Sequence, residues 1–117
     1  MTIKRLEPGA RMSQAVVHNG VVYLAGQVAE GANVTAQTGK VLAEIDRLLA
    51  LAGSSKSQLL SAQIFLSDIS TFADMNKVWD AWVDKANAPA RATVESKLAA
   101  RQFLVEIMVT AALLERL

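Results

Sequence analysis

The chain has 117 residues, 52% hydrophobic and 20% charged, and its net charge at pH 7 is +1. This composition predicts one folded domain over residues 1–117 and excludes a disordered chain. The near-neutral charge gives no electrostatic footprint for nucleic acid. Because cysteine is absent and His18 is the only histidine, disulfides and thiolate zinc sites are excluded, and a histidine-based metal site or catalytic triad is not expected.

The first predicted element is a β-hairpin. Two β-rich runs, residues 15–18 and 21–25, flank Asn19-Gly20, the kind of dipeptide that most favours a two-residue turn. His18 is expected as an exposed residue beside that turn. The lysine and arginine residues before the hairpin are expected to form a solvated edge.

Two helices are predicted, over residues 35–52 and 71–85, because hydrophobic side chains recur there at helical spacing. Gly53 is the stop signal of the first helix and Ser70 is the expected N-cap of the second. The apolar face of the second helix contains Phe72, Met75, Val78, Trp79, Trp82 and Val83. We interpret this aromatic stripe as core.

Three more strands are predicted, over residues 59–66, 91–96 and 103–113. The order of strands and helices indicates an α+β fold, one sheet with both helices on one face. Residues 21–26 and the last strand are apolar on both faces, so the other sheet face needs a cover of its own. A second copy of the chain is the expected cover, which predicts a homo-oligomer. No segment reads as a signal peptide or a membrane span, so a cytoplasmic protein is expected.

Arg91 and Glu106 are the candidate chemical residues. Glu106 lies within an apolar run, where a carboxylate is costly to bury unless it is paired or functional. If the last two strands pair, the two side chains face one space, where the guanidinium can grip a substrate carboxylate and Glu106 can act on water. A structural ion pair between subunits, or a glutamate that reaches solvent, is the alternative.

At these residues the chain resembles the Rid family, also known as YjgF-like or RidA-type proteins and formerly described as endoribonuclease L-PSP or translation inhibitor. The fragments that carry the resemblance are Arg11-Met12-Ser13-Gln14-Ala15-Val16, Tyr23-Leu24-Ala25-Gly26-Gln27, Phe72-Ala73-Asp74-Met75-Asn76, Pro89-Ala90-Arg91 through Glu95, and Val105-Glu106-Ile107. They occur in order and span nearly the whole chain. Residues 75–83 are similar to the YoaB-like branch.

The resemblance implies a chorismate-mutase-like fold of the bacillus type, in the order β-β-α-β-α-β-β, assembled as a trimer with clefts between subunits. It implies hydrolysis of reactive 2-imino or enamine acids to 2-keto acids and ammonia, a form of metabolite repair, without cofactor or metal. In the family pattern the arginine matching Arg91 grips the substrate carboxylate and the glutamate matching Glu106 orients or activates water. The residues matching Thr93 and Asn76 contact or border the pocket.

Three positions depart from the pattern of the family's deaminases. Met12 stands where they usually have tyrosine, Ala25 where they have serine, and Thr93 where they have cysteine. The loss of a phenol and a hydroxyl removes two polar partners from the pocket. Two further functions therefore stay open beside the deaminase: a module that binds small carboxylate metabolites without turnover, and a ribonuclease or translation inhibitor.

Overall fold

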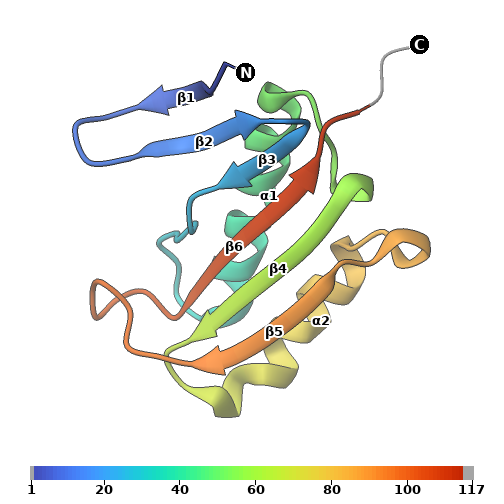
Figure 1. The fold of residues 1–117 in the computed structure, drawn as a ribbon. Helices are drawn as coiled ribbons and strands as arrows, with labels where there is room; N and C mark the ends of the chain where they lie inside the picture. Colours follow the sequence, from blue (N-terminus) through green and yellow to red (C-terminus); the bar gives the residue numbers. More distant parts are fainter. Residues whose placement is uncertain (1, 115–117) are drawn as a thin grey trace.

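Residues 2–114 are described by the structure, a computed structural model, and they form a sheet with two helices (Figure 1). The strands are β1 (Lys4–Pro8), β2 (Ser13–His18), β3 (Val21–Leu24), β4 (Leu59–Leu66), β5 (Ala90–Glu95) and β6 (Val105–Ala112). The helices are α1 (Val34–Ala52) and α2 (Phe72–Trp82), and short 3-10 turns cover Lys56–Gln58, Ile69–Thr71 and Lys85–Asn87. Neither α1 nor α2 is long and apolar enough to cross a membrane.

The strand order in the sheet is β1-β2-β3-β6-β4-β5, and both helices lie behind the sheet in Figure 1. The β4–β5 pair is parallel and every other pair is antiparallel. A parallel pair needs a crossover connection, which α2 supplies between β4 and β5. The predicted α+β sheet with two helices on one face is confirmed. The strand β1 was not predicted, so the order is β-β-β-α-β-α-β-β rather than β-β-α-β-α-β-β.

The turn between β2 and β3 has the geometry that its sequence predicts. Asn19 and Gly20 both have positive φ, 51° and 76°, as a two-residue hairpin turn matched to the twist of its strands requires. His18 pairs with Val21 at the end of the ladder. The expectation that His18 is exposed is wrong, because its side chain is half-buried and its Nδ1 is buried without a hydrogen-bond partner in the described chain.

The ends of α1 and α2 are fixed differently. At α1, Asn33 Oδ1 accepts a hydrogen bond from Ala36 N at 2.9 Å, and Gly53 ends the helix in the left-handed conformation as predicted. Ser70 is not the N-cap of α2, because it belongs to the preceding 3-10 turn, where Asp68 accepts from its N–H. The helix stops at Trp82 rather than at residue 85, since Val83 is already extended.

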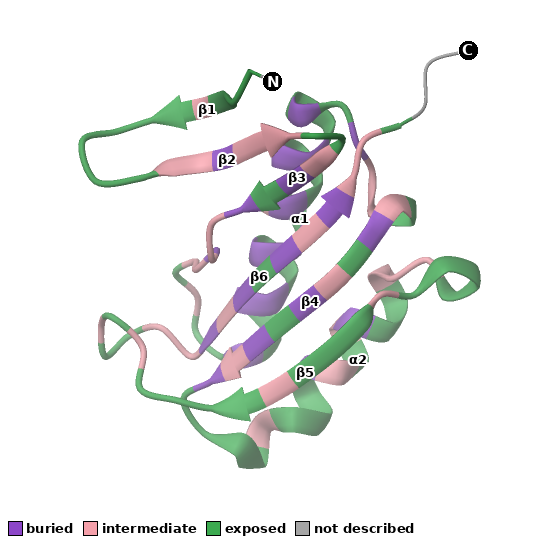
Figure 2. Ribbon diagram, in the orientation of Figure 1, coloured by how far each residue is buried: buried purple, intermediate pink, exposed green. Residues whose placement is uncertain are grey.

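The core lies between the helices and one face of the sheet. Fully buried side chains there include Val22, Leu42, Ile45, Leu49, Ile64, Met75 and Ile107. The opposite face, which we call the open face, carries large hydrophobic side chains that remain exposed: Tyr23 (49%), Val94 (47%) and Met108 (37%). Figure 2 shows exposed and half-buried residues alternating with buried ones along β6 and β4. One chain therefore leaves the predicted second apolar face of the sheet uncovered.

Candidate functional site

Arg91 and Glu106 do not lie on paired strands, because β4 runs between β5 and β6. Ala62 of β4 is in register with Arg91, and Phe65 of β4 is in register with Glu106. Ala62 is buried beneath the helices, whereas Phe65 points to the open face. Since residues in register point to the same face of a sheet, Arg91 lies on the helix face and Glu106 on the open face.

The distance between the two residues follows from strand geometry. Two strand spacings, about 10 Å, separate β5 from β6. The residue of β6 level with Arg91 is Val109, and Glu106 lies three residues away, again about 10 Å. Their Cα atoms are thus roughly 14 Å apart, with side chains on opposite faces. The condition under which the two groups would face one space, pairing of the last two strands, is not met within a single chain.

Arg91 is held by three side chains of α2. Its Nη1 donates to Asn76 Oδ1 at 2.7 Å, and its Cζ lies 5.8 Å from the centre of the Phe72 ring and 5.4 Å from that of Trp79. These helical positions are four and three residues apart and so share one face of α2, which packs over β5. Both aromatic contacts are within the range of a cation–π interaction. No carboxylate of the described chain bonds to Arg91.

Thr93 lies two residues from Arg91 on the same face of β5, in register with the core residue Ile64. Its Oγ1 is buried and has no hydrogen-bond partner among the described residues. A buried hydroxyl without a partner is costly, by about 1–3 kcal/mol. We call Arg91, Asn76 and Thr93, together with the Phe72 and Trp79 rings, the arginine half-site.

Glu106 lies against the backbone that follows β3. A Cβ placed on Gly26 would collide with the Glu106 carboxylate, so only glycine leaves room for it there. This segment is fixed by two hydrogen bonds between Gln27 and Ile107, at 2.9 and 3.1 Å. The described chain offers Glu106 no cationic partner. We call Glu106, Gly26 and Ala25 the glutamate half-site.

Ala25, directly after β3, and Met12 are the last two candidates. Ala25 N donates to Gln14 O at 2.9 Å, which ties the end of β3 to β2. Met12 lies in the turn between β1 and β2, where its carbonyl accepts from Gly9 N at 2.7 Å, and its side chain is 48% exposed. The structure thus separates the six predicted residues. Arg91, Asn76 and Thr93 come together in the arginine half-site, whereas Glu106 and Ala25 belong to the glutamate half-site and Met12 lies in the turn between β1 and β2.

Two surface hollows lie near these elements, and neither contains both Arg91 and Glu106. The first, of about 280 Å³, is lined by Ser61, Ala62, Gln63, Ala90, Arg91 and Ala92. The second, of about 340 Å³, lies at the loop between β5 and β6 and is lined by Ser67, Lys97, Leu98, Ala100, Arg101 and Phe103. Within residues 2–114, no group of three or more histidine, aspartate or glutamate side chains is arranged to hold a metal ion.

Sequence reasoning missed the part that Phe72 and Trp79 play in holding Arg91. Both were interpreted as core, and Trp79 is indeed buried, but Phe72 is 38% exposed. The available signal was the position of Asn76 on the same helical face, since a polar side chain between two rings marks the end of a purely apolar stripe. Gly26 was also missed as a residue that makes room for Glu106.

Comparison with known proteins identifies relatives that span nearly the whole chain. Residues 2–113 match the family model described as endoribonuclease L-PSP. The chain is 50% identical over 114 residues to a RutC family protein of Haemophilus influenzae, covering 95% of this chain and 98% of that protein. It is 46% identical to the RutC family protein YoaB of Escherichia coli, with 96% and 99% covered.

The fold also matches solved structures. A YjgF-family protein from Neisseria meningitidis superimposes with a TM-score of 0.97 at 44% identity, covering 99% of this chain and 98% of that one. The resemblance read from the five sequence fragments is confirmed, including the similarity to the YoaB-like branch. The chorismate-mutase-like fold is confirmed with it.

Proposed function

Since the chain belongs to the endoribonuclease L-PSP family, which includes the RutC, YjgF and Rid proteins, we propose that it hydrolyses reactive 2-imino acids and their enamine tautomers to 2-keto acids and ammonia. Family membership is consistent with a role in metabolite damage control. The observation that carries the proposal is the arginine half-site, a guanidinium that bonds to no carboxylate of the described chain. Such a group is suited to a planar carboxylate ligand.

The proposed reaction needs both half-sites. Arg91 binds the substrate carboxylate, and Glu106 orients a water molecule and takes its proton as the oxygen attacks the C=N carbon. Glu106 passes this proton to the imine nitrogen, which gives a carbinolamine. The hydroxyl proton of the carbinolamine then moves to the nitrogen as the C–N bond breaks, which releases ammonia and leaves the 2-keto acid. Thr93 and Asn76 border the pocket beside Arg91, and Ala25 and Met12 border it beside Glu106. No cofactor takes part in these steps.

The proposed pocket lies between two copies of the chain, because one chain holds the half-sites on opposite faces of its sheet. A neighbouring copy that covers the open face would bury Tyr23, Val94 and Met108 and bring its own β5 edge towards Glu106. We propose a trimer with three such pockets and a cytoplasmic location. Light scattering gives the subunit number, and cell fractionation tests the location.

The direct test of the reaction uses imines made in situ from several amino acids by an amino-acid oxidase. Wild-type protein should accelerate ammonia release from at least one of them, and Arg91→Ala should return the rate to that of the uncatalysed reaction. A variant that keeps full activity in an intact oligomer would remove Arg91 from the mechanism.

The side chains of Met12 and Ala25 favour a second function. Met12 and Ala25 supply no polar side-chain group beside Glu106. The alternative is therefore a module that binds 2-keto acids through Arg91 without turnover. Binding of a 2-keto acid by wild type but not by Arg91→Ala, together with no hydrolysis of any imine, would select it.

The family name also mentions an endoribonuclease activity. The net charge of +1 does not favour binding to an RNA backbone. The only histidine, His18, is half-buried at the end of β2. Three strands separate β2 from β5, so His18 lies far from Arg91 in the sheet. RNA binding that weakens steeply with added salt would be required to support this function.

A further inference from the structure

We propose that Phe72, Trp79 and Asn76 are positioning residues, which hold the Arg91 guanidinium in one orientation before a carboxylate ligand arrives. This inference rests on the proposed function, because it concerns how Arg91 of that site is prepared for its ligand. Arg91 is an exposed residue at the edge of the sheet, where a long side chain has many rotamers. Three contacts from α2 restrict it.

The contacts act on different parts of the guanidinium. The Phe72 and Trp79 rings lie within 5.8 and 5.4 Å of Cζ, and Asn76 Oδ1 accepts from Nη1 at 2.7 Å. The Nε and Nη2 donors have no partner among the described residues. These two nitrogens form one side of the planar group and can bind both oxygens of a carboxylate. We call the three contacts from α2 the arginine clamp. The clamp leaves one edge of the Arg91 guanidinium, with two donors, for a ligand.

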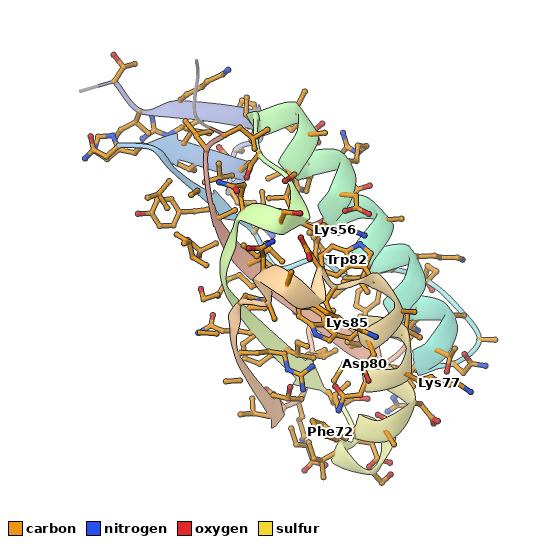
Figure 3. The ribbon with its side chains drawn as sticks, turned by 90° about the vertical axis from the view of Figure 1, so that its right-hand side faces the viewer. Lys56, Phe72, Lys77, Asp80, Trp82 and Lys85 are labelled. Atoms are coloured by element: carbon orange, nitrogen blue, oxygen red, sulfur yellow. The ribbon has the colours of Figure 1, made fainter. Side chains whose placement is uncertain are left out.

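The exposure of Phe72 separates a positioning role from a purely structural one. Trp79 is only 5% exposed and belongs to the hydrophobic core, so its loss would disturb the fold as well as Arg91. Phe72 is 38% exposed and stands at the start of α2, on the side of the molecule where β5 forms the sheet edge (Figure 3). Its ring can be removed with little loss of core packing.

The experiment compares Phe72→Leu, which removes the aromatic ring, with Phe72→Tyr, which keeps one. The control is Trp82→Phe on the same helix. Trp82 contacts Lys56 and donates to Asp46 rather than touching Arg91 (Figure 3), and phenylalanine keeps an aromatic ring beside Trp79. Calorimetry measures the dissociation constant of 2-oxobutanoate, a 2-keto acid that does not react further. We expect Phe72→Leu to weaken binding roughly threefold to tenfold, and the other two variants to bind like wild type.

Kinetics adds a readout that a structural role would not produce. A carboxylate contact made equally in the substrate complex and the transition state affects KM and leaves kcat unchanged. Phe72→Leu should therefore raise KM with an unchanged kcat and an unchanged melting temperature. Equal 2-oxobutanoate affinity and equal KM in Phe72→Leu and wild type would overturn the positioning role.

A measurement without ligand keeps this inference separate from the proposed function. In ¹H–¹⁵N spectra the Arg91 Nε–Hε signal of wild type should be shifted by the ring currents of Phe72 and Trp79. Phe72→Leu should reduce that shift, and Phe72→Tyr should restore it. A wild-type signal at the position of a free arginine would overturn the clamp. A shifted signal in a protein that neither binds nor hydrolyses carboxylates would support the clamp and overturn the function.

Discussion

Arg91 and Glu106 lie on opposite faces of one sheet, on strands that β4 separates. A single chain therefore holds a carboxylate-binding group and a candidate base that cannot meet. If the protein is an imine deaminase, its pocket belongs to the oligomer rather than to the chain. This relationship makes the function testable at the level of subunits.

Mixed oligomers give the sharpest test of a shared pocket. Arg91→Ala and Glu106→Gln should each be inactive alone. Equal amounts of the two variants are then unfolded together and reassembled. In each pocket, the subunit that supplies Arg91 is the Glu106→Gln variant with probability one half, and the subunit that supplies Glu106 is the Arg91→Ala variant with probability one half. Activity should return to about one quarter of wild type. No recovery, in oligomers shown by mass spectrometry to be mixed, would contradict a pocket between subunits.

Arg91→Lys keeps the charge but loses the planar fork and the contacts with Asn76 and the rings. We expect kcat/KM for imine hydrolysis to fall roughly 10-fold to 150-fold, since hydrogen bonds to a charged group are worth about 1.5–3 kcal/mol. Arg101→Lys in the exposed loop before β6 is the matched control and should behave like wild type. Near-normal activity of Arg91→Lys would mean that charge alone is sufficient.

Gly26→Ala tests the space beside Glu106. A Cβ at this position must displace the Glu106 carboxylate, so we expect kcat/KM to fall roughly tenfold to 100-fold. An unchanged kcat/KM in Gly26→Ala would show that Glu106 does not need this space for the reaction. Gly39→Ala in α1 is the control, because its Cβ meets nothing within 4 Å. It should raise the free energy of unfolding by about 0.5–1 kcal/mol without changing activity.

Thr93→Val should stabilise the protein. The variant removes a buried hydroxyl that has no partner in the described chain and keeps the shape of the side chain. We expect the free energy of unfolding to rise by about 1 kcal/mol in urea titrations. Thr38→Val is the matched control, since Thr38 Oγ1 is buried and donates to Val34 O at 2.7 Å. It should lower stability by a similar amount, and a loss of stability in Thr93→Val would show that its hydroxyl is bonded within the oligomer.

The turn that leads into β5 should lose stability in acid. Hydrogen bonds from Asn87, Ser57 and the Ala86 N–H to Asp84 hold the pKa of its carboxyl below the ordinary value. Because the folded pKa is the lower one, the carboxylate stabilises the fold above the unfolded pKa of about 3.9, and this contribution is lost as pH falls through the depressed folded value. Asp84→Ala should lower the melting temperature at pH 7. Its difference from wild type should shrink below about pH 4, and a constant difference down to pH 2 would contradict this.

Local patterns in the sequence determined most of the secondary structure, because helical and strand periodicity depend only on neighbouring residues. They located the Asn19-Gly20 turn and placed Arg91 and Thr93 on one face of their strand. The strand β1 escaped prediction because Lys4–Pro8 forms an exposed edge of mostly polar residues, which carries no alternating pattern. The end of α2 was placed too late because the 3-10 turn after it continues a helix-like composition.

Only the tertiary structure decided which strands are neighbours. The crossover through α2 pairs β5 with β4 in parallel, and β6 then fills the space between β4 and β3. Such pairing is set by packing between distant segments, which local periodicity does not encode. The sequence by itself thus determined that Arg91 and Glu106 are the chemical residues worth testing. The tertiary structure decided that they face away from each other, and that Arg91 is prepared by rings the sequence assigned to the core.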